Sequence, residues 1–273
     1  MAANLIILIM TVCLVGVSVT CWRFPVFRSV AMRIHVIHTL YEERLARSTR
    51  PFLARGSKVQ RCRQCMLRTH LCICEHRPLA TSNAAFLLVM FDDEILKPSN
   101  TGRLIADVFE DTFAYIWSRT EPNAEMLALL DDPQWQPYVV FPAEYAPERE
   151  VTTVTLEAGK RPLFIMLDGS WAEAKKMFRK SPYLDRFPLL SINPDKPSRY
   201  KMREASKENQ LGTAEVAARI IDLFGEHHNA ELLDLWFDVF RENYIAGKMN
   251  RQLPEQSSLS LLKQFMLVDE TSL

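Results

Sequence analysis

Short apolar runs and amphipathic stretches alternate along this chain from residue 84 onward, and this alternation restricts the folds that it can adopt. Runs of strand length stand at 84–91, 112–117, 138–141, 163–167 and 188–192, with a weaker, more polar one at 151–156. Residues at helical spacing lie between these runs, at 101–109, 123–132, 171–180 and 213–224. Strands separated by helices predict an α/β fold with a mostly parallel sheet.

The C-terminal third carries its own helix signals. The hydroxyl of Thr213 can cap the helix expected at 213–224, and Gly225 follows its last residue. Residues 230–245 place apolar side chains at helical spacing, which predicts a helix that packs on the core. The weaker pattern beyond that point predicts a poorly specified tail over 248–273.

An uncharged apolar segment spans residues 4–22. Its length is at the short end for a membrane span, which needs roughly 20 apolar residues. As an anchor it would leave the remaining chain in the cytoplasm, because Arg23 and Arg28 follow it. The alternative is that residues 1–31 come from an upstream start codon and that the native chain begins at Met32. A secretory signal peptide fits less well, because no positive segment precedes the run.

The charges of the chain balance, with 33 basic and 33 acidic side chains, and this argues against a nucleic-acid binder. Their distribution argues the other way, because residues 44–68 carry eight basic residues and no acidic one. Such a segment can hold a phosphate backbone locally, since the attraction is screened beyond about 10 Å. The eight residues are Arg44, Arg47, Arg50, Arg55, Lys58, Arg61, Arg63 and Arg68.

Four cysteines fall within thirteen residues, as a CxxC pair followed by a CxC pair: Cys62, Cys65, Cys72 and Cys74. Four thiolates complete the tetrahedral sphere of a structural zinc ion, although the second pair departs from the usual spacing. Nearby His70 and His76 are then not needed as ligands. Free or buried thiols are the main alternative, and a disulfide is less favoured in a cytosolic protein.

Three predicted loops share a chemistry suited to ligand binding: 97–103, 168–171 and 211–215. The first two lead from a predicted strand into a helix, and ligands gather at the carboxyl ends of parallel strands. Each loop offers backbone N–H groups, hydroxyls and a glycine. Taken singly, each is also an ordinary helix cap. The chain has no GxG and no GxSxG sequence, which excludes the dinucleotide fingerprint, the P-loop and the common serine-hydrolase elbow.

A basic face is expected on the helix at 171–180, and further basic residues follow at Arg199, Lys201 and Arg203. A charged helical face is usually only solvated. Here it begins one turn from Asp168, and basic residues beside a candidate site suit a phosphate-rich substrate. The residues of the face are Lys175, Lys176, Arg179 and Lys180.

Residues 168–171, Asp-Gly-Ser-Trp, resemble the signature of the DTW-domain family, with serine where threonine is commoner. The cysteine cluster, the loop at 98–103, Phe141-Pro142 and residues 213–215 occur in the same order as in that family. The resemblance covers roughly residues 40–250. Within the family, the chain is similar in particular to the bacterial tRNA-uridine aminocarboxypropyltransferases. It implies S-adenosylmethionine as donor, N3 of a tRNA variable-loop uridine as acceptor and methylthioadenosine as by-product. Similarity to related ribosomal-RNA enzymes implies a SPOUT-like, knotted core behind an N-terminal zinc element.

Under this resemblance Asp168 is the candidate general base for the uridine N3 proton. Its rival roles are binding the donor's ammonium and capping the next helix. Trp171 or Phe141 would provide an apolar wall for adenine. The expected donor-binding residues are Ser99, Asn100, Thr101, Gly102, Phe141, Pro142, Gly169, Ser170, Trp171, Gly212, Thr213 and Glu215. The expected RNA-binding residues are Arg50, Arg55, Arg61, Lys175, Lys176, Arg179, Lys180, Arg199 and Arg203.

Two rival functions stay open. A SPOUT-type RNA methyltransferase would share the donor and the RNA but transfer a different carbon. A non-enzymatic, zinc-stabilised RNA-binding protein would leave residues 168–171 without a purpose. The domain layout expected is an apolar segment (1–31), a basic zinc-binding region (32–80), a catalytic domain (81–247) and the tail. The partner expected is tRNA in the cytoplasm, with no obligatory protein partner and a membrane only if 1–31 is an anchor.

Overall fold

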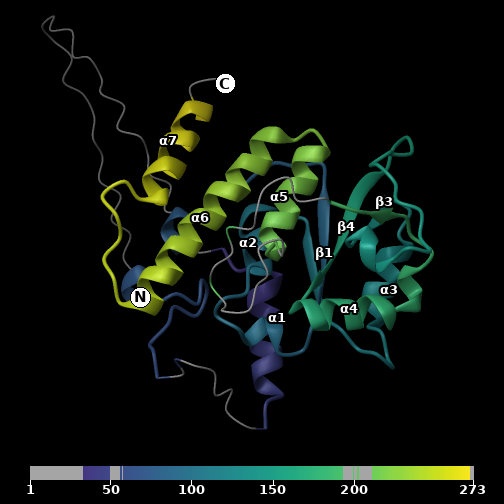
Figure 1. The fold of residues 1–273 in the computed structure, drawn as a ribbon, viewed down its shortest axis with the longest axis horizontal. Helices are drawn as coiled ribbons and strands as arrows, with labels where there is room; N and C mark the ends of the chain where they lie inside the picture. Colours follow the sequence, from purple (N-terminus) through teal and green to yellow (C-terminus); the bar gives the residue numbers. More distant parts are fainter. Residues whose placement is uncertain are drawn as a thin grey trace, which may run out of the picture. The chain divides into compact units, whose positions relative to one another are not determined.

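The predicted apolar runs assemble into a parallel sheet in a computed structural model that describes residues 33–49, 56, 58–192, 199, 202 and 211–270. Within these residues, five strands lie in the order β2-β1-β4-β3-β5, and all neighbouring pairs are parallel (Figure 1). The α/β prediction is therefore confirmed. The strands are β1 (Ala85–Met90), β2 (Thr112–Ile116), β3 (Trp135–Val140), β4 (Arg161–Asp168) and β5 (Leu189–Leu190).

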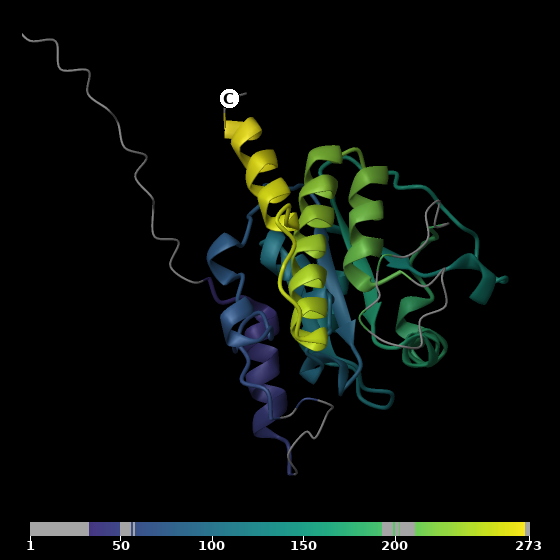
Figure 2. The ribbon, with the colours of Figure 1, turned by 60° about the vertical axis from the view of Figure 1, so that its left-hand side comes forward.

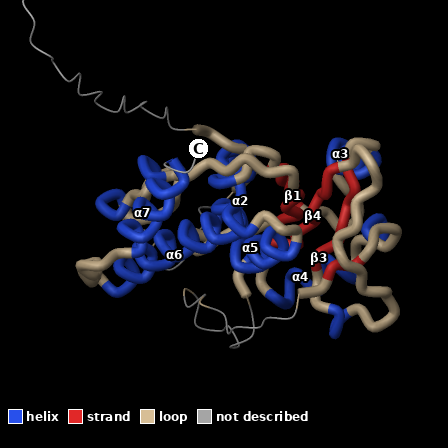
Figure 3. Tube along the Cα trace, turned by 90° about the horizontal axis from the view of Figure 1, so that it is seen from above, coloured by secondary structure: helices blue, strands red, loops and turns tan. Residues whose placement is uncertain are grey.

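Helices cover both faces of the sheet (Figure 3). One face packs against α1 (Val36–Ala46), α2 (Gly102–Val108), α5 (Thr213–Leu223) and α6 (His227–Met249). The other packs against α3 (Ala124–Asp131) and α4 (Trp171–Arg179). Burial on both faces explains why β1 is a continuous apolar run, in which Leu88 faces the first layer and Leu87 the second. Short 3₁₀ turns lie at Thr69–Leu71, Cys74–His76, Glu94–Leu96, Ala143–Tyr145 and Pro182–Leu184.

The C-terminal helices differ from the expectation in length and number. The predicted helix at 230–245 is part of α6, which packs beside α5 (Figure 2). The tail prediction is wrong over α7 (Ser258–Glu270), a helix that packs on α6. Leu262 is fully buried against the core, and Phe265 stacks on His228 with ring centroids 4.6 Å apart. These two apolar contacts hold the helix on the core. They span so few residues that the sequence pattern does not predict a helix here.

Two local predictions need correction. The stretch 151–156 forms no strand, and only Val151 makes an isolated bridge to Leu189. The N-cap of α5 is Gly212, not Thr213, so the Thr213 hydroxyl is available for another bond. Gly225 does follow the helix in the left-handed conformation, with φ +94°, which glycine adopts without a steric cost.

No helix within the described ranges is both long and apolar enough to cross a membrane. The apolar segment at 4–22 lies outside those ranges, so both interpretations of it stay predictions. Residues 32–273 form one compact unit, and the features below belong to it.

A half-buried pair of histidines connects the start of α1 to α2. The His35 and His38 rings stack with centroids 3.8 Å apart, and His35 Nε2 lies 3.0 Å from Asp107 Oδ1. Asp107 also receives bonds from Arg77 and from the Trp236 indole. Burial is the main cause that lowers the pKa of His38 to about 3, and the positive charges of His35 and Arg77 lower it further. The folded chain therefore keeps His38 neutral.

This pair predicts a loss of stability in acid. The unfolded chain binds a proton at His38 near pH 6.5, whereas the folded chain binds it only near pH 3. Its contribution to stability is thus complete above pH 6.5 and falls as the pH drops from 6.5 toward 3. We expect the melting temperature to fall less steeply between pH 7 and 5 in His38→Gln than in wild type. The exposed His70→Gln is the control, and an unchanged slope in His38→Gln contradicts the assignment.

Candidate functional site

The three predicted loops meet at the carboxyl edge of the sheet. Asp168 is the last residue of β4, and the parallel register places it beside Met90, the last residue of β1. The loop before α2 and the start of α5 complete the cluster, because Asn100 and Thr213 both bond to Asp168. Residues far apart in sequence therefore lie within hydrogen-bond distance, as the topology of parallel strands requires.

The Asp168 carboxylate is the centre of this cluster and is 2% exposed. Asn100 Nδ2 donates to Oδ2 over 2.6 Å, and the Thr213 hydroxyl donates to Oδ1 over 2.5 Å. Two donors of this kind stabilise the ionised carboxylate.

Arg103 orders the loop that presents Asn100. Its guanidinium donates to the carbonyl oxygens of Asn100, Lys97 and Gln64, over 3.3, 3.3 and 3.2 Å. The side chain is buried, and burial lowers its pKa although nearby Asp107 opposes the shift. Arg103 belongs to the loop at 98–103 that the sequence analysis singled out, but the sequence predicted no role for it. The signal that could have indicated one is its position near the start of a short and largely apolar helix, where a buried arginine needs partners.

A cavity of about 300 Å³ lies beside the cluster, at the lower end of the range for small-molecule sites. Thr213 lines the cavity and bonds to Asp168, so it connects the two. Five expected donor-binding residues line this cavity: Phe141, Pro142, Gly169, Trp171 and Thr213. The sequence interpretation missed its apolar walls, which include Val140, Met166, Ile192, Leu211 and Val216.

Other expected donor-binding residues hold the loops in shape. Ser170 caps α4 in a capping box with Glu173, and its backbone N–H donates to Glu173 Oε2 over 2.6 Å. Burial raises the pKa of Glu173, but the Ser170 bonds and the charge of Lys97 outweigh it, and the net shift is downward. Glu215 accepts the backbone N–H groups of Gly212 and Arg199, each over 2.8 Å.

The remaining loop residues, Ser99 and Thr101, are buried. Thr101 Oγ1 accepts the backbone N–H of Ala214 over 3.4 Å, which joins the first loop to α5. Glu94 is buried as well, and its carboxylate receives Asn100 Nδ2 at 3.4 Å and Lys97 Nζ at 2.8 Å. The first loop thus contacts both other loops through short polar bonds.

Gly102 lets this loop approach Asp168, and substituting it gives a sharp prediction. A Cβ there would stand 2.6 Å from Asp168 Oδ2, a clash with a side chain that two other residues already fix. We expect Gly102→Ala to weaken donor binding by about tenfold, although alanine normally favours a helix. Gly247→Ala, a helical glycine packed on Leu71 instead, is the control with unchanged donor affinity in calorimetry. Wild-type donor affinity in Gly102→Ala contradicts the tight contact.

The four cysteines form one cluster, as predicted. All four Sγ atoms lie within 4.8 Å of one another, with Cys62–Cys74 at 3.6 Å and Cys65–Cys72 at 3.8 Å. Zinc–sulfur bonds of about 2.3 Å in a tetrahedron place the sulfurs about 3.8 Å apart, so the residues fit zinc. Arg77 donates to Cys74 Sγ over 3.9 Å, as residues that surround a metal site donate to its ligands.

The basic residues expected to hold RNA fall into separate places. Lys175 lies 4.6 Å from the centroid of the Tyr145 ring, and Lys176 lies over Phe91 and Trp117. Arg179 and Lys180, at the end of α4, are exposed. This face remains available to a phosphate backbone.

Arg199 has a different environment, because Asp234 and Asp238 of α6 both pair with it. Arg61 lies in residues 58–68, which carry Cys62 and Cys65 and are called the cysteine turn below, and it lines another cavity. Arg50, Arg55 and Arg203 lie outside the described residues. The structure therefore brings the predicted donor residues together around Asp168 and its cavity, whereas the described members of the predicted RNA-binding set lie on different elements.

The cavity and the buried polar cluster lie at the carboxyl edge of a parallel sheet, which is where α/β proteins commonly bind ligands. The family model for the DTW domain matches residues 59–245, more than half of the chain, and the chain belongs to the DTW-domain family. Membership of this family is consistent with a tRNA-modifying enzyme. No solved structure matches this chain.

Proposed function

We propose that the protein transfers the 3-amino-3-carboxypropyl group of S-adenosylmethionine to N3 of a tRNA variable-loop uridine. The convergence of three loops on Asp168, next to the 300 Å³ cavity, carries this proposal. The cavity suits the adenosine end of the donor, since Phe141 and Trp171 line it together with polar Thr213. The enzyme would act in the cytoplasm without an obligatory protein partner.

The reaction breaks one C–S bond and forms one C–N bond. N3 of the uridine loses its proton to Asp168 and attacks the Cγ carbon of the donor. The electron pair of the broken bond stays on sulfur, which leaves as neutral methylthioadenosine. Three carbons on the sulfonium are activated, so selectivity depends on which of them faces N3. Thr213 bonds to Asp168 and lines the cavity, and this connection would set that geometry.

The core is proposed to be SPOUT-like and knotted. In support of this, β4 lies between β1 and β3 although it follows both in sequence. The chain also returns after β5 to place Gly212 and Thr213 at the carboxyl edge. An experimental trace of residues 190–213 would decide whether the chain passes through a loop of its own.

The test is a nucleoside mass measurement with the full-length chain, S-adenosylmethionine and unmodified tRNA. A uridine heavier by one aminocarboxypropyl group, with methylthioadenosine released, is the expected result. A gain of one methyl group with S-adenosylhomocysteine released would instead support the methyltransferase alternative. Calorimetry with the donor is the second readout, because a protein that binds tRNA but no donor would be a binding module.

A further inference from the structure

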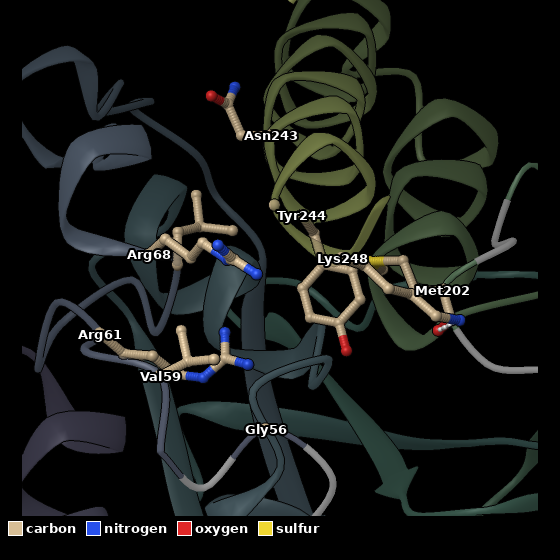
Figure 4. A pocket seen from close by; sticks show the side chains of 10 residues that line it. Gly56, Val59, Arg61, Arg68, Met202, Asn243, Tyr244 and Lys248 are labelled. Atoms are coloured by element: carbon tan, nitrogen blue, oxygen red, sulfur yellow. Dashed lines mark hydrogen bonds between the residues drawn. The ribbon is translucent and has the colours of Figure 1, made fainter. Parts of the chain in front are cut away.

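A second cavity, of about 430 Å³, lies between the cysteine turn and the C-terminal half of α6. Arg61 and Arg68 line it from the turn, whereas Tyr244 and Lys248 line it from the helix. Figure 4 shows both guanidinium groups extending from the turn toward the Tyr244 ring. No part of the transfer reaction described above uses this cavity.

The fold of the cysteine turn brings the two arginines together. Arg61 and Arg68 are antiparallel bridge partners, because the turn closes with Cys62 N–H donating to Leu67 O over 2.8 Å. Met66 adopts the left-handed conformation inside this turn, with φ 61°. The two basic side chains therefore leave adjacent positions on one small, tightly folded element, and two of the cysteines lie within it.

The cations of this cavity lack acidic neighbours. Among the described residues, no carboxylate lies within 4.0 Å of the charged groups of Arg61, Arg68 or Lys248. Arg61 donates to the Met66 carbonyl oxygen over 3.1 Å, and Lys248 donates to that of Met202 over 3.3 Å. Both side chains keep further donors for a ligand.

The electrostatics of the cavity favour an anion. Arg61 and Arg68 are paired across the bridge of the turn, and both line the same cavity. Two like charges held this close repel each other, and a bound anion would remove that cost. Arg and Lys side chains with a hydroxyl beside them match the oxygens of a phosphate group.

We propose that this cavity binds a phosphate of the RNA backbone, with Arg61, Arg68 and Lys248 as its cationic ligands. The inference rests on the proposed function, since it gives the RNA substrate of that reaction a contact point outside the transfer site. A polynucleotide fits better than a free anion, because exposed Lys58 and Arg63 continue the basic surface on the same turn. The Tyr244 ring, half-buried at the wall, offers a stacking surface for the adjoining base.

The test is the salt dependence of tRNA binding in the full-length double variant Arg68→Gln/Lys248→Gln. We expect tRNA affinity to fall at least about tenfold, and the slope of log K against log salt to shrink by about 0.7–0.9 for each phosphate that the variant no longer neutralises. Arg251→Gln, a cation just past α6 that does not line the cavity, is the matched control with the wild-type slope. Donor affinity in calorimetry should stay unchanged in all variants.

An unchanged slope in the double variant overturns the proposal. A cavity that binds only free phosphate also overturns it. In that case inorganic phosphate would stabilise the wild type but not the double variant, and the slopes for tRNA binding would be the same in both proteins. The two proposals fail separately. A reduced slope without any modified nucleoside keeps the phosphate site and refutes the transferase, whereas a modified nucleoside with the wild-type slope does the reverse.

Discussion

Asp168→Asn is expected to lower turnover by about 10²–10⁴-fold, the range that general base catalysis contributes, while donor affinity stays at the wild-type value. The substitution changes charge and basicity but almost no volume. Single-turnover kinetics with unmodified tRNA measures the chemical step, and calorimetry with S-adenosylmethionine measures the affinity. The two readouts together separate a base from a donor-binding group.

The geometry allows this substitution to remove the charge of residue 168 while keeping its hydrogen bonds to Asn100 and Thr213. The oxygen of the new amide can accept from Asn100 Nδ2, as Asp168 Oδ2 does over 2.6 Å. Its NH₂ group can donate to the Thr213 hydroxyl, which then becomes the acceptor. Both of these hydrogen bonds to residue 168 therefore survive. A loss of turnover in this variant reports on the negative charge and not on the loss of the cluster.

Two other outcomes assign Asp168 to its rival roles. A large loss of donor affinity identifies the carboxylate as the partner of the donor's ammonium group. Full turnover with unchanged affinity leaves it only the role of joining the loops. Thr213→Val is the matched control for that structural role, because it removes the hydrogen bond from the Thr213 hydroxyl and keeps the charge. We expect it to cost far less turnover than Asp168→Asn.

The sequence predicted the sheet because the strands that matter most are buried on both faces. Runs such as 84–91 and 163–167 have no polar face, so they stand out as β1 and β4. The edge of the sheet was harder. Only Leu189 and Leu190 of the run 188–192 pair as a strand, beside β3 at one edge of the sheet.

The polar residues of the site were predicted more completely than its walls. Asn100, Asp168 and Thr213 stood in short polar motifs, and the parallel topology was sufficient to bring them together. The cavity walls depend on side-chain packing between β3, β4 and α5, which no periodic pattern specifies. Arg103 was missed for a similar reason, because its partners are backbone carbonyl oxygens that carry no sequence signal.

The role of Arg61 depended on tertiary structure in the same way. Its charge was visible in the basic segment, but its partners Tyr244 and Lys248 lie more than 180 residues away in sequence. Arg199 shows the opposite case. It belonged to the same expected set, yet the fold places it between two carboxylates of α6. Charge counts alone cannot distinguish a cation that is available from one that is already paired.

Removal of zinc is expected to have the largest effect on stability. We expect a strong chelator to lower the melting temperature by more than about 10 °C, because structural zinc sites contribute several kcal/mol to folding. Cys65 and Cys74 are buried in the main core with Leu67 and Ile73, so opening the cluster also exposes apolar surface. Cys62→Ser should reproduce the loss without chelator. Cys21→Ser, a cysteine outside the cluster in sequence, is the control with the wild-type melting temperature.

Zinc removal should also weaken both proposed sites, and this distinguishes a structural ion from four thiols without a metal. The Gln64 carbonyl inside the cysteine turn accepts from Arg103, which orders the loop of Asn100. The same turn carries Arg61 and Arg68 into the phosphate cavity. Below the new melting temperature, the chelated protein should therefore bind donor more weakly and show a reduced salt slope for tRNA. A protein that purifies without zinc and melts identically with and without chelator would show that the four thiols hold no structural ion.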